Sequence, residues 1–122
     1  MPITYFTQLR TWQKARDFAV AVYTTTDKFP QKELYGMSSQ LRRSSVSISA
    51  NVAEGFSRKT AKDKNQFYTI AIGSLTETMS HLFVAEKLGY CDQHDLQWYI
   101  AESEDLSKML YGMIKSSQER RM

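Results

Sequence analysis

Apolar residues recur at steps of three and four along nearly the whole chain, and few residues are present that would interrupt a helix. The chain has only two prolines and five glycines in 122 residues, too few turn-forming residues for an architecture of strands and turns. No segment alternates apolar and polar residues with period two, whereas steps of three and four are typical of amphipathic helices. The sequence therefore predicts the all-α class.

Residues that stop or cap helices divide this pattern into segments. A first helix is predicted over residues 8–27. It ends before Pro30, because the residue before a proline avoids the helical region. A second helix is predicted to begin at Ser38 or Ser39, since either serine can accept a hydrogen bond from an unpaired amide of the first turn. Gly55 suits the left-handed position just beyond the end of that helix.

Two further helices follow in the second half of the chain. Thr60, with Asp63 three residues later, resembles a capping box and marks the start of a third helix that ends at Gly89. Asp92 then caps a fourth helix. Four helices with short connections favour an antiparallel up-and-down bundle, and the length predicts a single domain over residues 1–122.

The third of these segments is apolar on more sides than one bundle can cover. Over residues 65–85 Glu77 carries the only formal charge, and Ile70, Val84 and Leu88 lie on a third side of the helix, beyond the two apolar sides that a bundle buries. A helix that is apolar on three sides must be covered on three sides, so we expect the chain to associate with copies of itself. Glu77 at the centre of the segment argues against a membrane span.

The residues that carry most enzyme and metal chemistry are scarce. Cys91 is the only cysteine, so thiolate zinc sites and disulfides are excluded, and His81 and His94 are the only histidines. Di-metal sites in helix bundles need two carboxylate–histidine pairs, and the chain offers one. We therefore predict no catalytic residue, metal or cofactor; a small enzyme using Glu54 and Glu77 is the alternative. The first residues lack the features of a signal peptide, so a cytoplasmic location is expected.

Positive charge is concentrated in the first half of the chain. Residues 1–64 hold 11 Lys/Arg and 5 Asp/Glu, whereas residues 65–122 hold 5 and 8. Such clustering attracts phosphate backbones or an acidic protein face, and an ordinary solvated surface is the alternative. The candidate nucleic-acid contacts are seven cations: Arg10, Lys14, Arg42, Arg58, Lys59, Lys62 and Lys64.

The second helix also carries a polar stripe, because several of its polar residues are three or four positions apart and share one side. One interpretation is a surface for a ligand or nucleic acid. The other is a network in which Arg43 meets Glu54 or Glu77 across helices or subunits and fixes their register. The proposed members of this structural network are Gln40, Arg43, Ser47, Asn51, Glu54 and Glu77.

The stretch from Phe29 to Arg58 reads FPQKELYGMSSQLRRSSVSISANVAEGFSR. It closely resembles the bacterial four-helix-bundle proteins encoded in intervening sequences of 23S rRNA genes, whose pattern is like FP-x-x-E-x-x-G-L-x-x-Q-x-x-R-A-x-x-S-I-x-x-N-I-A-E-G-x-x-R. The likeness continues into the third helix at Gly73, Ser74 and Glu77. Departures are mild, and none removes a distinctive polar residue of the pattern.

The resemblance implies a four-helix bundle that assembles as a ring-like homo-oligomer, a homopentamer in that family. A related member, the accessory variability protein of diversity-generating retroelements, binds nucleic acid and a reverse transcriptase through a basic surface of its pentamer. The function expected from the resemblance is a non-enzymatic, homo-oligomeric accessory protein that binds nucleic acid, RNA foremost. The alternative is an interaction scaffold that docks an acidic partner or an enzyme like a reverse transcriptase.

Overall fold

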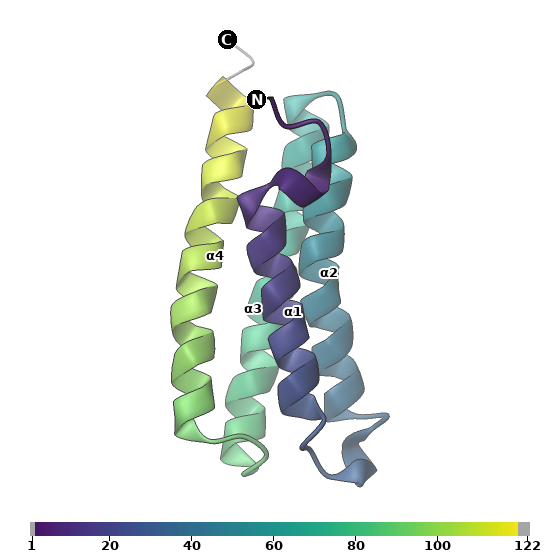
Figure 1. Ribbon diagram of the computed structural model, residues 1–122, viewed down its shortest axis with the longest axis vertical. Coiled ribbons are helices and arrows are strands. Elements are labelled where there is room, and N and C mark those ends of the chain that lie inside the picture. The colour runs from purple at the N-terminus through teal and green to yellow at the C-terminus, as the bar shows by residue number, and fades with distance from the viewer. Residues whose placement is uncertain (1, 120–122) are drawn as a thin grey trace.

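The computed structural model describes residues 2–119, which form four long helices and two short 3-10 turns, with no strand among them (Figure 1). The all-α class and the four helices predicted from the sequence are confirmed for these residues. The elements are η1 (Phe6–Gln8), α1 (Arg10–Thr26), η2 (Gln31–Glu33), α2 (Met37–Ser57), α3 (Ala61–Lys87) and α4 (Gln93–Glu119).

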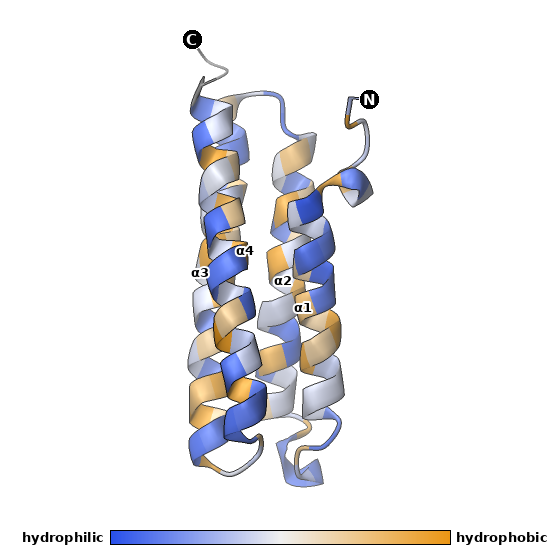
Figure 2. Cartoon of the chain, turned by 60° about the vertical axis from the view of Figure 1, so that its left-hand side comes forward, coloured by the Kyte–Doolittle hydropathy of each residue, from blue (hydrophilic) through white to orange (hydrophobic). Residues whose placement is uncertain are grey.

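The four helices lie side by side, and the chain turns back on itself at each connection (Figure 1). Hydrophobic and hydrophilic residues alternate along every helix in the pattern of amphipathic segments (Figure 2). The buried core draws on all four helices; its largest side chains include Phe18, Leu41, Ile48, Leu82, Tyr99 and Leu106. The connection between α2 and α3 lies at one end of the molecule, and the other two connections lie at the opposite end.

The starts of α1 and α2 differ from the predictions. Helix α1 begins at Arg10, later than the predicted residue 8, because the preceding residues form the separate turn η1. Helix α2 begins at Met37 without a serine cap, and Ser38 is buried in its first turn. The Met37 amide instead donates to a carboxylate oxygen of Glu33, 3.1 Å away. The acceptor at this helix end therefore comes from the preceding connector.

The expectation for Gly55 was also wrong. Helix α2 continues through Gly55 to Ser57, and Gly89 is the only glycine with a positive φ, 79°. Gly55 is required for a different reason, since a Cβ atom there would lie 2.5 Å from Cε1 of the buried Tyr68 in α3. The missing side chain thus allows α2 and α3 to approach each other closely.

The predicted caps of the other helices are present. The Thr60 hydroxyl accepts a hydrogen bond from the Asp63 amide at 3.1 Å, and an Asp92 carboxylate oxygen accepts from the Asp95 amide at 2.8 Å. Helix α3 ends at Lys87, close to the predicted end at Gly89, and Gly89 itself has a left-handed conformation. These short local signals are therefore sufficient to locate both ends of α3 and the start of α4.

The third apolar side of α3 is not covered by the other helices. Ile70, Val84 and Leu88 retain between 46% and 53% of their exposed surface. Phe83 is 48% exposed on another side of the helix, about 140° from Ile70 at about 100° per residue. None of the described helices is long and apolar enough to cross a membrane.

Candidate nucleic-acid interface and polar seam

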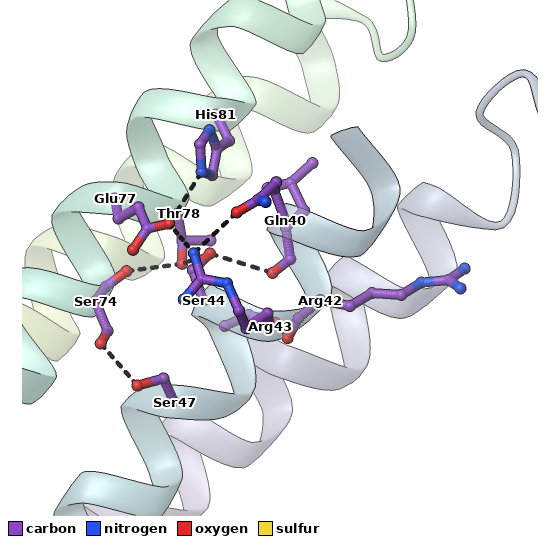
Figure 3. Close-up of polar contacts among 11 residues, drawn as sticks. Gln40, Arg42, Arg43, Ser44, Ser47, Ser74, Glu77, Thr78 and His81 are labelled. Carbon is purple, nitrogen blue, oxygen red and sulfur yellow. Dashed lines mark hydrogen bonds and ion pairs between the residues drawn. The ribbon is translucent and has the colours of Figure 1, made fainter. Parts of the chain in front are cut away.

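Small polar side chains of α2 and α3 meet along the contact between the two helices, and we call this row the polar seam (Figure 3). The Thr78 hydroxyl donates a hydrogen bond to the Ser44 hydroxyl at 2.7 Å, and both side chains are fully buried. The hydroxyls of Ser47 and Ser74 lie 2.9 Å apart. Residue numbers rise along α2 as they fall along α3, so these pairs fix one register between the helices.

At its outer edge the polar seam becomes ionic. Arg43 forms an ion pair and hydrogen bond with Glu77, and it also donates to the Gln40 side-chain oxygen at 3.0 Å (Figure 3). His81, one turn after Glu77, lies 3.2 Å from the same carboxylate oxygen. The Arg43 side chain remains 56% exposed and that of Glu77 39%, so this pair is worth far less than a buried one.

The environment of Glu77 favours its charged form. Partial burial raises the pKa of Glu77, but hydrogen bonds from His81 and Arg43, together with the Arg43 charge, lower it by more. The pKa of Glu77 therefore lies below its usual value.

The other predicted members of the network are placed differently. Asn51 donates from its amide to the Ser47 carbonyl at 2.8 Å and the Ser47 hydroxyl at 3.0 Å, within its own helix. Glu54 lies outside the polar seam, where it pairs with Arg58 at 3.7 Å and accepts from the Ser57 hydroxyl at 3.2 Å. The structure therefore brings Arg43 together with Glu77 and not with Glu54.

Sequence reasoning missed three members of the polar seam: Ser44, Ser74 and Thr78. The stripe on α2 was read from polar residues at helical spacing, and Ser44 falls beside it rather than on it. A matching set of hydroxyl residues four positions apart on the third helix, Ser74 and Thr78, was the available signal. It becomes informative only once the register of the two helices is known.

Four of the seven candidate cations gather at the connection between α2 and α3, and we call this group the basic end: Arg58, Lys59, Lys62 and Lys64. Lys59 and Lys62 are exposed, and no acidic side chain of residues 2–118 lies within ion-pair distance of either. Arg58 stacks on the Phe67 ring at 4.7 Å and pairs only loosely with Glu54.

Lys64 is held by the end of α2. Its ammonium donates to the Phe56 carbonyl at 2.8 Å and the Gly55 carbonyl at 3.4 Å, and it lies over the Phe56 ring. The last carbonyls of a helix lack partners within the helix, and a lysine there satisfies them and complements the helix dipole. Lys64 therefore connects α2 to α3 and contributes positive potential from a fixed position.

The remaining three candidate cations lie on α1 and α2, and Arg10 is the exposed first residue of α1. Arg42 extends away from Arg43 (Figure 3) and donates to the Thr26 hydroxyl at 2.8 Å and to Asp27 at 2.9 Å. Lys14 pairs with Glu102 of α4 at 2.5 Å. Arg42 is separated from the basic end by roughly 24 Å of helix, at about 1.5 Å per residue, so the seven cations do not form one surface.

No group of three or more His, Cys, Asp or Glu side chains within the described part of the chain is arranged to hold a metal ion. Glu77 and His81 form a pair without a third ligand. Cys91 is half-buried, and burial together with nearby carboxylates raises the pKa of its thiol, which disfavours the reactive thiolate.

Comparison with known proteins places these features in context. The family model described as 23S rRNA-intervening sequence protein matches residues 7–112. Among solved structures, the chain is similar to a protein of unknown function from the S23 ribosomal protein family of Bacteroides thetaiotaomicron. The two chains are 25% identical, and the alignment covers 86% of this chain and 98% of the other with a TM-score of 0.76. No curated protein matches the sequence significantly.

Proposed function

Because the chain belongs to the 23S rRNA-intervening sequence protein family, we propose that it is a non-enzymatic accessory protein that binds nucleic acid, RNA foremost, through the basic end. The observation that carries this proposal is the pair Lys59 and Lys62, which are exposed beside Arg58 and have no acidic partner among residues 2–118. The matching family and the similar solved structure indicate no enzyme family.

The chemistry of the basic end suits a phosphate backbone. Lysine and arginine side chains that contact phosphates release condensed counterions, which gives binding that depends strongly on salt and weakly on base sequence. Arg58 is held over Phe67, so part of its side-chain entropy is already lost before binding. The two lysines are unconstrained by ion pairs within the described chain and can follow the backbone of a flexible strand.

The proposal includes assembly of antiparallel up-and-down bundles into a ring-like homo-oligomer, a pentamer by family resemblance. The support is the uncovered side of α3, where Ile70, Val84 and Leu88 are about half exposed. An apolar helix side that the bundle leaves exposed needs another surface to cover it. Several copies of a small basic end, held together by symmetry, act as one multivalent surface. Native mass spectrometry measures the copy number directly.

The test of the binding proposal is the double variant Lys59→Glu with Lys62→Glu. Its affinity for labelled single-stranded RNA, measured by fluorescence anisotropy at about 50 and 200 mM salt, should fall sharply, and its salt dependence should become shallower. Lys64 is left unchanged because it satisfies the carbonyls at the end of α2.

The matched control is Lys32→Glu with Lys87→Glu, which changes the net charge equally at exposed positions at the opposite end of the molecule from the basic end. This control should lose much less affinity than the first variant. Equal losses in the two double variants would show that net charge, and not the basic end, determines binding.

A second candidate function is an interaction scaffold that docks an acidic protein or an enzyme like a reverse transcriptase. The observation that favours it lies in the connector after η2, where Leu34 is 43% and Tyr35 92% exposed, since exposed aromatic residues are common anchors in protein interfaces. A partner that is still captured after nuclease treatment, and that is lost with Tyr35→Ala, would support the scaffold.

A further inference from the structure

A groove lies between the end of α1 and the start of α4, at the opposite end of the molecule from the basic end (Figure 1). Its volume is about 410 Å³, within the range that small-ligand sites occupy. The lining contains an aromatic wall, two cationic or imidazole groups and one carboxylate: Trp98 and Tyr99, Lys28 and His94, and Asp95.

The aromatic wall is accessible and well supported. Trp98 retains 45% of its exposed surface, and its ring meets the Tyr99 ring at 5.2 Å and 82°. Tyr99 itself is buried, and its hydroxyl lies 2.6 Å from the Thr25 hydroxyl of α1. The indole is therefore held between a fixed neighbour and solvent, where a planar ligand can stack on it at little cost in side-chain entropy.

The polar lining suits a nucleotide better than an acidic peptide. Lys28 and His94 are exposed, and no carboxylate among residues 2–118 forms an ion pair with either, so both can donate to a phosphate. Asp95, in the same lining, can accept from a base amino group or a sugar hydroxyl, donors that an acidic side chain lacks. Aromatic stacking combined with backbone cations is the general mode of single-strand recognition.

We propose that this groove binds one nucleotide unit of a single strand, with the base stacked on Trp98 and its phosphate beside Lys28 and His94. The inference rests on the proposed nucleic-acid function and adds a second contact point, remote from the basic end. It also assigns a role to Trp98, a large aromatic side chain that the fold leaves exposed.

The test uses the two tryptophans of the chain, Trp12 and Trp98. A short oligouridylate should quench the fluorescence of the wild-type protein and should not quench Trp98→Phe, in which only Trp12 remains. By anisotropy, Trp98→Ala should bind the labelled strand about 5- to 150-fold more weakly, the range for loss of one stacked base. Tyr111→Ala is the matched control, since it removes another exposed aromatic residue of α4 that lies outside the groove.

Two further measurements identify the ligand and the cation that contacts it. Uridine monophosphate, titrated in parallel, distinguishes a free nucleotide from a strand: quenching by the strand at much lower concentration supports the proposal, and equal potency overturns the strand assignment. Lys28→Ala should weaken strand binding, whereas Lys32→Ala should not.

Failure of this inference and failure of the proposed function give different results. Strand binding that is lost in the Lys59→Glu, Lys62→Glu variant but unchanged in Trp98→Ala overturns the groove and leaves the basic end. Trp98-dependent quenching that persists in the charge-reversal variant supports the groove and overturns the basic end. Absence of strand binding by the wild-type protein at low salt overturns both.

Discussion

Substitution of Gly55 by alanine tests the close approach of α2 and α3. The added Cβ would lie 2.5 Å from Cε1 and 2.8 Å from Cδ1 of Tyr68, and 3.1 Å from the Lys64 carbonyl oxygen. Tyr68 is 2% exposed and borders a cavity of about 430 Å³, but the Lys64 carbonyl belongs to the backbone of α3 and cannot rotate away. One of the two helices must therefore shift.

The expected magnitude follows from two opposing contributions. Alanine is favoured over glycine within a helix by about 0.8–1 kcal/mol, and overpacking a core typically costs about 1–3 kcal/mol. With contacts this short the second contribution dominates, and we expect Gly55→Ala to lower the free energy of unfolding by about 1 kcal/mol. Gly73→Ala should instead raise it by about 1 kcal/mol, because a Cβ at Gly73 meets nothing within 4 Å.

Urea denaturation followed by circular dichroism measures both changes, at one fixed protein concentration because the stability of an oligomer depends on it. Gly112→Ala is a second control, since Gly112 also faces open space on a different helix. Removing the ring with Tyr68→Val should relieve the clash, so Gly55→Ala should lower the free energy of unfolding by less in that background. Equal stabilisation by Gly55→Ala and Gly73→Ala would refute the close approach.

Two further predictions concern the polar seam. Because the pKa of Glu77 is lowered in the folded state, its stabilising contribution is full above the usual value of 4.5 and is lost as the pH falls through the folded pKa. Glu77→Gln should therefore make the free energy of unfolding less dependent on pH in the acid range, while costing less than about 1 kcal/mol near neutral pH. An unchanged pH dependence in the acid range would contradict this. Thr78→Val leaves the buried Ser44 hydroxyl without its donor and should cost about 1–3 kcal/mol in chemical denaturation; adding Ser44→Ala should restore part of that loss, whereas strictly additive losses would contradict the pairing.

The fold was predictable from the sequence to the extent that local signals determine it. The caps at Thr60 and Asp92 and the left-handed Gly89 depend on residues within one turn, and the structure contains all three. The start of α2 was mispredicted because Glu33, four residues earlier in the connector, supplies the acceptor that a serine was expected to provide. Gly55 was mispredicted because a tertiary partner decides it: Tyr68 of α3 excludes a side chain there. A sequence pattern carries no information on such distant contacts until the register is known.

The partners of the charged residues at the candidate site also depend on tertiary contacts that the sequence pattern does not reveal. Adjacent residues Arg42 and Arg43 contact different helices, one bonded to Thr26 and Asp27 near the end of α1 and the other to Glu77 of α3 (Figure 3). The sequence placed Arg42 among the candidate nucleic-acid contacts and Arg43 in the polar stripe, but it gave no sign that Asp27 pairs with Arg42. The structure separates the two arginines, because neighbouring positions on a helix point about 100° apart.

Pairing within the chain also determines how much of its positive charge can contact phosphate. Outside the basic end, Lys14 and Arg42 are paired with carboxylates. Within it, Lys64 is bound to carbonyls, so each basic end offers chiefly Arg58, Lys59 and Lys62. Three contacts to a single strand give a slope of log affinity against log salt of about −2. A protomer acting alone would therefore bind weakly at physiological salt. The groove at Lys28 and His94 would add one phosphate contact in each copy. A measured slope steeper than these contacts allow requires basic ends from more than one copy on the same strand, which would link binding to assembly. A slope near −2 from a tight complex would show that binding does not require assembly.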